Sequence, residues 1–448
     1  TFTSTYYDTT EHRLARHRIA LCRRRAGKET RWDLVLFGHP ARPVMPCAER
    51  SLHPPSTIRD ALFAHLRGDE LAPMFKFRTR RTGIQVSDGE RTLATIVFDT
   101  ITQLDGRRVV RRFSELTIEP IDADESALSR IETVLRSAGA VDGDEQPAIF
   151  RAIGLEIPPR QPAMPPAAPT IDHLKAKFAA EVEAILAHDP VTRLGVDPED
   201  LHQMRVSTRR LRAILRAAKA MLVAEWADGL RAELAWLGEA LGRVRDLDVL
   251  LHRFHNESAA LDPLERRAFE RLLVSLEAER AEARAAMLGG LRSDRYLQLL
   301  DRLRAAADAP ETVPSTLSLR DLAAGEFKKL RQTVQALVPD PPDSELHAVR
   351  IKVRRARYAA ELAEVAVGRP ATRFIERAKT LQQILGQHQD AVVAEDRLRR
   401  LISRAGGKRA VFAAGLIVER LRAHGRASRA AFHDLWTKLQ KRGRKAWG

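Results

Sequence analysis

The spacing of apolar residues changes along the chain and separates two regions. In residues 1–157, short apolar runs alternate with polar and turn residues, which is typical of half-buried strands. Gly89 and Asp105-Gly106 lie between such runs and predict turns. Strands are expected at 31–37, 91–98 and 111–118, and helical segments near 56–67 and 124–138. The pattern predicts an α+β region dominated by antiparallel strands.

From residue 170 onward, apolar residues recur with the 3.6-residue period of an α-helix. Proline and glycine residues, such as Pro263 and Gly406-Gly407, divide this pattern into segments. Eight helices are expected, near 171–188, 198–223, 227–257, 263–289, 318–337, 343–366, 371–403 and 409–440. The segment 158–169 contains six prolines, which exclude a helix or a central strand and predict a stiff, extended linker.

The helical region, residues 170–448, contains an internal repeat. The sequence LHQMRV, starting at Leu201, matches LHAVRI, starting at Leu346. Further along, LGRVRD, starting at Leu241, matches LGQHQD, starting at Leu385. Two motifs separated by nearly the same offset predict two pseudo-symmetric four-helix bundles, at about 170–310 and 315–445.

Charge is distributed unevenly between the two regions. The chain carries a formal net charge of +16, of which residues 1–169 contribute only +3 and residues 170–448 contribute +13. This excess indicates an anionic partner, which could be nucleic acid, polyphosphate or an anionic membrane surface. The sequence has two cysteines and no long apolar run, which argues against a disulfide framework and a membrane span. With no signal peptide at its start, the chain is expected to be cytoplasmic.

A histidine followed by arginines at helical spacing appears once in each repeat. At about 100° per residue, these side chains share one face of their helix. In the first copy they are His202, Arg205, Arg209, Arg212, Arg216 and Lys219. In the second copy they are His347, Arg350, Arg354 and Arg357, followed by Glu361. Because guanidinium groups bind phosphate oxygens in a bidentate manner and stay charged, this face predicts a site for a polyanion.

A second interpretation of the arginine face stays open. An arginine-rich helix face is usually solvated and paired with acidic residues. Asp246 and Asp390 each follow a glycine and could pair with an arginine of the preceding helix. His202 and His347 could instead cap or pack the start of their helices.

The repeated motifs resemble those of the CHAD domain, the conserved histidine α-helical domain, over roughly residues 170–440. This resemblance implies two helical bundles around a basic groove that binds inorganic polyphosphate, and it places His202, Arg205, Arg209, Arg212, His347, Arg350, Arg354 and Arg357 in that groove. Arg243, Arg245 and His388 are additional candidates. Polyphosphate binding would require no cofactor, and a location on polyphosphate granules is expected. Gln387 and Gln389 replace arginines of the first copy, so one end of the groove is expected to be less basic.

The N-terminal region resembles a CYTH domain, an antiparallel β-tunnel that binds triphosphate and often hydrolyses it with Mg²⁺ or Mn²⁺. The resemblance rests on Tyr6-Tyr7-Asp8-Thr9, on Cys22-Arg23-Arg24-Arg25 and on Trp32, and it covers about residues 1–155. It implies phosphate binding by Arg23, Arg25, Arg78, Arg80 and Arg81, and metal binding by Glu115 and Glu119. The first strand of the family is absent from the sequence and is expected upstream of Thr1.

Several positions depart from the CYTH pattern and predict a domain that binds phosphate without cleaving it. Val35 and Ala148 stand where the family carries lysines, and Val44 and Thr117 stand where it carries acidic residues. Glu115 and Glu119 could instead simply alternate with apolar residues along a half-buried strand.

Three functions therefore compete. The first alternative is a polyphosphate-binding protein that does not bind a membrane. The second alternative is a metal-dependent inorganic triphosphatase with the helical region as a polyphosphate tether. The third is a nucleic-acid-binding protein, although aromatic residues amount to only 5% of the chain and single-strand binding commonly needs stacking platforms. Weak, salt-dependent binding to nucleic acid is expected in any case.

Overall fold

The computed structural model describes residues 1–37, 42–47, 51–89, 91–143, 150, 164–405 and 407–448. The chain divides into two compact units, Thr1–Arg160 and Gln161–Gly448. The first part of the predicted linker, 158–163, lies outside the described residues. Among the residues described, no helix is both long and apolar enough to cross a membrane.

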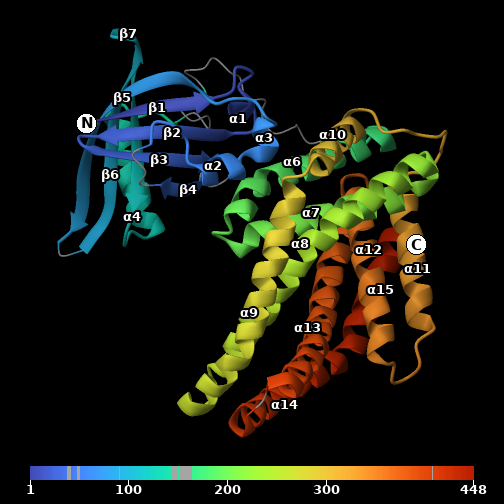
Figure 1. Cartoon of the computed structure of the whole chain (residues 1–448). Helices are drawn as coiled ribbons and strands as arrows, with labels where there is room; N and C mark the ends of the chain where they lie inside the picture. Colours follow the sequence, from blue (N-terminus) through green and yellow to red (C-terminus); the bar gives the residue numbers. More distant parts are fainter. Residues whose placement is uncertain (38–41, 48–50, 90, 144–149, 151–163, 406) are drawn as a thin grey trace. The chain divides into compact units, whose positions relative to one another are not determined.

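The first unit is built on one antiparallel sheet of seven strands in the order β4-β3-β2-β1-β5-β6-β7 (Figure 1). The strands are β1 (Phe2–Asp8), β2 (Ile19–Ala26), β3 (Glu29–Leu36), β4 (Arg42–Cys47), β5 (Ala72–Asp88), β6 (Arg91–Asp105) and β7 (Arg108–Pro120). The helices are α1 (Arg13–Arg16), α2 (Ser56–Ala61), α3 (Phe63–Leu66) and α4 (Glu125–Ser137). The strands predicted at 31–37, 91–98 and 111–118 and both helical segments are confirmed.

Turns that contain glycine join the long strands of this sheet. Gly89 and Gly106 both have positive φ, 66° and 58°, which glycine adopts without steric cost. They lie at the β5–β6 and β6–β7 connections, as predicted from the sequence. Among the described strands, β4 and β7 are the two edges of the sheet, so the closed tunnel stays a prediction.

The second unit contains ten α-helices within its described residues, five in each repeat. The first repeat holds α6 (Thr170–Leu194), α7 (Pro198–Ala217), α8 (Ala224–Ser258), α9 (Pro263–Leu291) and α10 (Asp294–Asp308). The second holds α11 (Leu319–Gln335), α12 (Asp343–Val367), α13 (Arg369–Ala405), α14 (Lys408–Ala430) and α15 (Phe432–Trp447). A short 3₁₀ helix, Lys219–Met221, follows α7.

Four helices of each repeat contact one another, but they are not the four consecutive helices expected from the sequence, because α10 and α15 take the fourth place. α6, α7, α8 and α10 contact one another in a ring, and α11, α12, α13 and α15 do the same in the second repeat. The helix predicted at 409–440 is in fact two helices, α14 and α15. They separate at Ala431 because α14 packs against α9 while α15 packs against α11 and α13. The helix α10 was not predicted at all.

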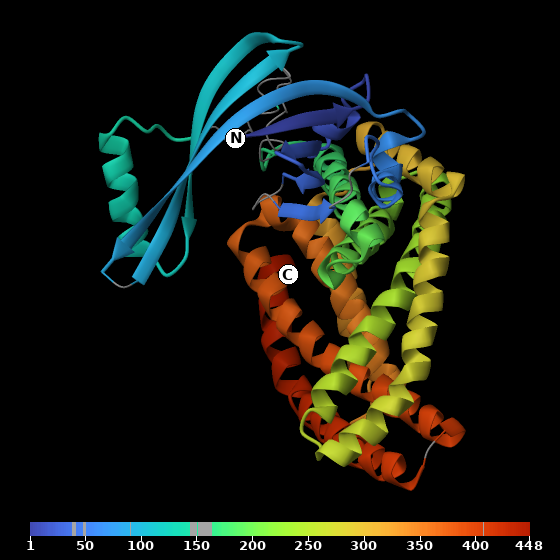
Figure 2. The ribbon, with the colours of Figure 1, turned by 60° about the vertical axis from the view of Figure 1, so that its left-hand side comes forward.

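The fourth helix of each repeat, α9 or α14, lies outside these rings and joins the two repeats together. α9 pairs with α8, α14 pairs with α13, and α9 contacts α14, which brings the two hairpins together at their far ends (Figure 2). Their shared core includes Leu251, Phe254, Phe269, Leu398 and Ile417, all buried. Burial of this apolar surface between the hairpins is a main source of the stability of the unit.

Candidate anion-binding cleft

The helices α7 and α12, which carry the two histidine–arginine faces, pack against each other. α7 begins where the Asp197 side chain accepts a hydrogen bond from the Glu199 backbone N–H and Pro198 takes the first helical position. Leu201, Met204 and Leu211 are buried on one side of this helix. At about 100° per residue, the centre of the arginine face lies roughly 100° from the centre of this apolar side. The arginines are therefore turned toward α12 instead of into the core of the first repeat.

A cavity of about 110 Å³ lies between these two helices and is lined mainly by arginines. The lining residues are Arg209, Arg212, Ala213, Arg216, Arg231, Ile351, Arg354, Arg355 and Tyr358. None of them is acidic. The repeats therefore bring their cationic faces together at one site, which we call the arginine cleft and define by its six arginines.

The arginine cleft is electrostatically strained. Burial, followed by the positive charge of Arg209, lowers the pKa of Arg354 to about 10. Burial also lowers the pKa of Arg209, Arg212 and Arg216, and neighbouring arginines lower each of them further. The buried Nε of Arg209 has no hydrogen-bond acceptor within the protein. An anion held here would relieve the mutual repulsion and accept these hydrogen bonds.

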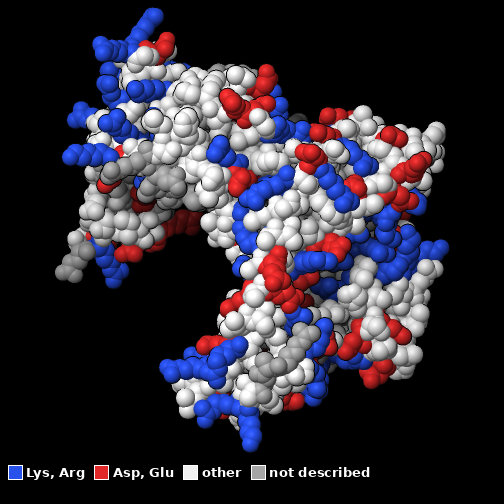
Figure 3. Space-filling model, in the orientation of Figure 1, with Lys and Arg blue, Asp and Glu red and all other residues white. Residues whose placement is uncertain are grey.

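This strain distinguishes the cleft from the protein surface. On the face shown in Figure 3, many basic side chains stand beside acidic ones, and others gather in groups. Many exposed arginines pair with a neighbouring carboxylate, as Arg295 does with Glu233 at 2.8 Å and Arg422 with Glu395 at 2.7 Å. Exposed pairs of this kind contribute little to stability and leave little net field.

The glycines of the second repeated motif lie beside the arginines of the first. A Cβ at Gly242 would stand 3.3 Å from Arg205, and one at Gly386 would stand 3.7 Å from Arg350. Arg205 also forms an ion pair with Asp246 at 2.9 Å, as the sequence had suggested. Glycine at these positions therefore leaves room for an arginine to lie against the neighbouring helix.

The two motif histidines lie partly buried near the ends of the cationic faces. Burial, and next the charge of Arg245, lowers the pKa of His202. In the second copy, His347 Nδ1 lies 3.0 Å from Oε1 of Gln389. In each repeat, a residue of the second motif therefore lies near the histidine of the first motif: Arg245 near His202, and Gln389 near His347.

Several residues expected in the groove are instead engaged inside the protein. Arg357 is buried, paired with Glu361 and hydrogen-bonded to Gln382 at 3.0 Å. His388 is also buried, with Nε2 2.9 Å from Asp343 and Nδ1 3.3 Å from the Gly425 carbonyl. In both cases a partner distant in sequence occupies the side chain, which helical periodicity could not reveal.

The first cationic face is also shorter than expected. The helix predicted at 198–223 ends at Ala217, so Lys219 lies in the 3₁₀ turn and pairs with Asp228 at 3.2 Å. Arg243 is exposed and pairs with Glu239 at 3.1 Å. Neither residue lines the arginine cleft.

Two lining residues were not assigned to the cationic faces. Arg231 comes from α8, and Arg355 lies one residue beyond Arg354 on α12. Arg355 does not share the helical spacing of the cationic face, and the sequence offered no signal for Arg231. Only the packing of α8 against α7 brings Arg231 to the cleft.

Strand register divides the phosphate-binding residues predicted in the sheet between its two faces. Arg25 and Arg78 both pair with Thr3, so they share a face with Arg23 and Arg80, two residues away. Arg81 lies on the opposite face and forms an ion pair with Asp99 at 2.7 Å.

The face that carries Arg81 also holds the predicted metal ligands. Asp99 is in register with Glu115, and Glu119 follows four residues later on the same face. Arg24, which the sequence reasoning did not select, lies on this face too. Its guanidinium group is 4.6 Å from the centre of the Phe2 ring, and that of Arg81 is 5.6 Å from the same ring.

A comparison with protein families identifies the domain in the helical unit. The profile of the CHAD domain matches residues 176–399, half of the chain. The chain belongs to the CHAD-domain family.

A solved CHAD structure agrees with this assignment, and the chain is also similar to two other proteins. "PptA from Streptomyces chartreusis" is 26% identical with a TM-score of 0.51, covering 60% of this chain and 100% of its own. The CHAD domain of the plant Ricinus communis is 25% identical with a TM-score of 0.51, covering 62% of this chain and 94% of its own. The "Uncharacterized protein Rv2226" of Mycobacterium tuberculosis is 28% identical over 98% of this chain and 90% of its own length.

These similarities identify the arginine cleft as part of a CHAD domain. Arg209 and Arg354, which line it from the two repeats, both lie within the matched residues. The antiparallel sheet of the first unit fits the expectation of a CYTH domain, and the CYTH assignment itself stays a prediction.

Proposed function

We propose that this CHAD-domain protein binds inorganic polyphosphate in the arginine cleft. The observation that carries the proposal is that six arginines from α7, α8 and α12 line one cavity without any acidic lining residue. A chain of phosphates carries a regular series of negative charges, and arginine forks suit its oxygens. The same proposal includes an association with polyphosphate granules, and it requires no metal or other cofactor.

The test is the affinity of the full chain for polyphosphates of several lengths. The variant replaces Arg209, Arg212, Arg354 and Arg355, four of the six cleft arginines, with alanine. Its matched control replaces four exposed arginines that pair with carboxylates elsewhere on the helices, namely Arg295, Arg399, Arg400 and Arg426. We expect the cleft variant to lose at least 100-fold in affinity and the control to lose only a few-fold by its reduced net charge. Equal losses in the two variants would contradict the proposal.

Competition between polyphosphate and DNA at physiological salt separates this function from nucleic-acid binding. If the arginine cleft recognised only negative charge, it would bind polyphosphate and DNA about equally, and its affinity for both would fall steeply with salt. We expect long-chain polyphosphate to displace DNA. A clear preference for DNA would favour the nucleic-acid alternative.

We further propose that the N-terminal sheet binds triphosphate without hydrolysing it. The supporting observation is that arginines already occupy two carboxylates on the face of Arg24 and Arg81. Asp33 lies 3.1 Å from Arg24 and 3.1 Å from Arg31, and Asp99 lies 2.7 Å from Arg81. Phosphate release from triphosphate with Mg²⁺ or Mn²⁺ tests this. Turnover at ordinary enzyme rates, ~1–10³ per second, would instead support the metal-dependent triphosphatase.

A further inference from the structure

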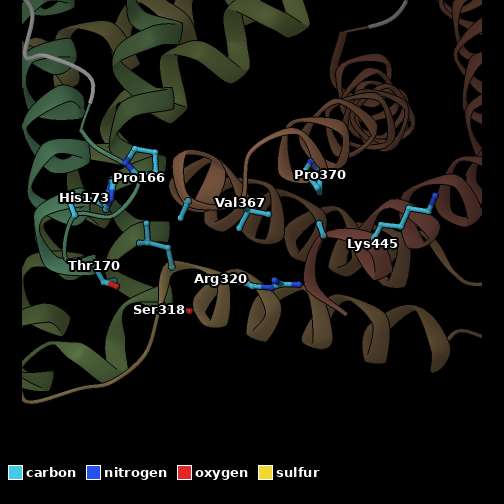
Figure 4. A pocket seen from close by; sticks show the side chains of 12 residues that line it. Pro166, Thr170, His173, Ser318, Arg320, Val367, Pro370 and Lys445 are labelled. Atoms are coloured by element: carbon cyan, nitrogen blue, oxygen red, sulfur yellow. The ribbon is translucent and has the colours of Figure 1, made fainter.

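A cavity of about 420 Å³ lies in the helical unit among residues outside all the motifs considered so far. It is open to solvent and lined by the segment before α6, the first turns of α6, α11 and α13, the end of α12 and the last turn of α15 (Figure 4). Cavities of this size accommodate small organic ligands. The elements around it come from both repeats, so the cavity exists only because the two repeats pack together.

One wall of this cavity carries a buried polar group without a partner. His173 is only 5% exposed, and its Nε2 atom is buried without a hydrogen-bond partner within the protein. Figure 4 shows His173 on the same side of the cavity as Pro166 and Thr170. Because a buried polar atom without a partner destabilises the protein, this nitrogen favours a ligand that hydrogen-bonds to it.

The electrostatics of the cavity favour an anion. Arg320 and Lys445 line it, and none of its lining residues is acidic. Three helices, α6, α11 and α13, begin at the cavity and two, α12 and α15, end there, so the helix dipoles leave a small net positive potential. The nearby carboxylate of Asp321 is engaged in the capping box of α11, where it accepts hydrogen bonds from the backbone N–H and the hydroxyl of Ser318.

Much of the remaining wall is apolar. Pro166, Ala366, Val367 and Pro370 line the cavity beside the cationic residues. Inorganic phosphate would leave these residues uncovered, whereas a ligand with an organic body would bury them. The chemistry therefore fits a molecule that joins a phosphate group to a flat or apolar body.

We propose that this cavity is a second anion site, distinct from the arginine cleft, that binds a small organic phosphate of about the size of a nucleoside monophosphate. The phosphate group lies near Arg320 and Lys445. The organic body lies against Val367 and Pro370, with a polar atom hydrogen-bonded to Nε2 of His173.

Titration calorimetry of the full chain with three probes tests the ligand class. The probes are adenosine monophosphate, adenosine and inorganic phosphate. We expect adenosine monophosphate to bind at least tenfold more tightly than either of the others, because it alone supplies both the phosphate and the organic body. Failure of all three to bind at millimolar concentration, or equal binding of inorganic phosphate and adenosine monophosphate, would overturn the proposal.

Variants locate the binding and separate it from the arginine cleft. Replacing Arg320 and Lys445 with alanine should weaken adenosine monophosphate at least tenfold. Replacing Lys441 and Arg444, cations of α15 that do not line the cavity, should change it less than twofold. The exposed Ala366 offers a second test, because Ala366→Phe fills the cavity without disturbing the core. Binding that survives both cavity variants, or that is lost in Arg209→Ala/Arg354→Ala, would show that the site lies elsewhere.

Discussion

The two repeats place equivalent helices, α7 and α12, at the same cleft but use their arginines differently. In α7, Arg212 and Arg216 line the cleft. At the equivalent positions of α12, Arg357 and Glu361 pair with each other inside the protein. Conversely, Arg355 lines the cleft, whereas its counterpart Arg210 lies 3.5 Å from Glu181 and 3.5 Å from Glu361.

Duplication therefore preserved the position of the helix but not the role of each arginine. The single change from Arg216 to Glu361 at equivalent positions provides a carboxylate that holds one arginine from each repeat, Arg210 and Arg357. The charge directed at the cleft is therefore unequal, with three arginines from α7 and two from α12.

The largest effect is expected from removing each repeat's contribution separately. Arg209→Ala/Arg212→Ala/Arg216→Ala should weaken polyphosphate binding about 1,000-fold, and Arg354→Ala/Arg355→Ala about 100-fold, since a charge-assisted hydrogen bond contributes about 1.5 kcal/mol or more. Calorimetric titration with one polyphosphate length measures both. If the double variant of α12 is affected as strongly as the triple variant of α7, the asymmetry has no functional consequence.

Glu361→Ala should break the internal pairing that distinguishes α12. Arg357 and Glu361 are both mostly buried, so Glu361→Ala leaves the buried charge of Arg357 without a carboxylate and should lower the free energy of unfolding by about 2–4 kcal/mol. Urea denaturation measures this. Glu419→Ala, which removes the exposed partner of Arg426, is the matched control and should cost less than about 1 kcal/mol. Similar costs for the two variants would mean that the Glu361 pairs are not structural.

His202 should make polyphosphate binding depend on pH. Burial and Arg245 lower the pKa of His202, so the unfolded chain binds a proton more readily than the native protein. The contribution of His202 to the free energy of unfolding is therefore present above the ordinary histidine pKa of about 6.5, and it is lost as the pH falls. A bound polyanion reverses this preference by favouring the protonated ring.

We accordingly expect affinity for polyphosphate to rise about threefold between pH 7.5 and 5.5 because binding takes up a fraction of a proton at His202. Titrations at several pH values measure this rise. His202→Gln should flatten it, whereas His433→Gln, at an exposed position on α15, should not. A profile that is unchanged in His202→Gln would assign the pH dependence to another group.

The smallest effect is expected at the exposed end of the first cationic face. Asp246 pairs with Arg205 but its side chain is 68% exposed. Asp246→Asn should therefore release Arg205 for the ligand and strengthen polyphosphate binding about two- to threefold. Glu239→Gln removes an equal charge beside Arg243, outside the cleft, and provides the comparison. An equal gain in both variants would show that only net charge matters.

The periodicity of the sequence predicted much of this architecture because local pattern determines where helices and strands form. Helical spacing predicted α7 and α12, and their matching motifs predicted the repeat. The same patterns placed His202, Arg205 and Arg209 on one face, since side chains three or four residues apart on a helix are neighbours. Turn glycines, such as Gly89 and Gly106, similarly marked the ends of long strands.

Only the tertiary structure decided which arginines face the cleft and which are neutralised. Arg357 and His388 fit the cationic pattern, yet Gln382 and Asp343, on other segments, bind them internally. Arg231 fits no pattern, yet the packing of α8 brings it to the cleft. Periodicity reports direction around one helix axis, whereas burial and ion pairing depend on what the neighbouring helices present at that point. The sequence alone therefore established a cationic helix in each repeat, and packing between the repeats determined the site they form.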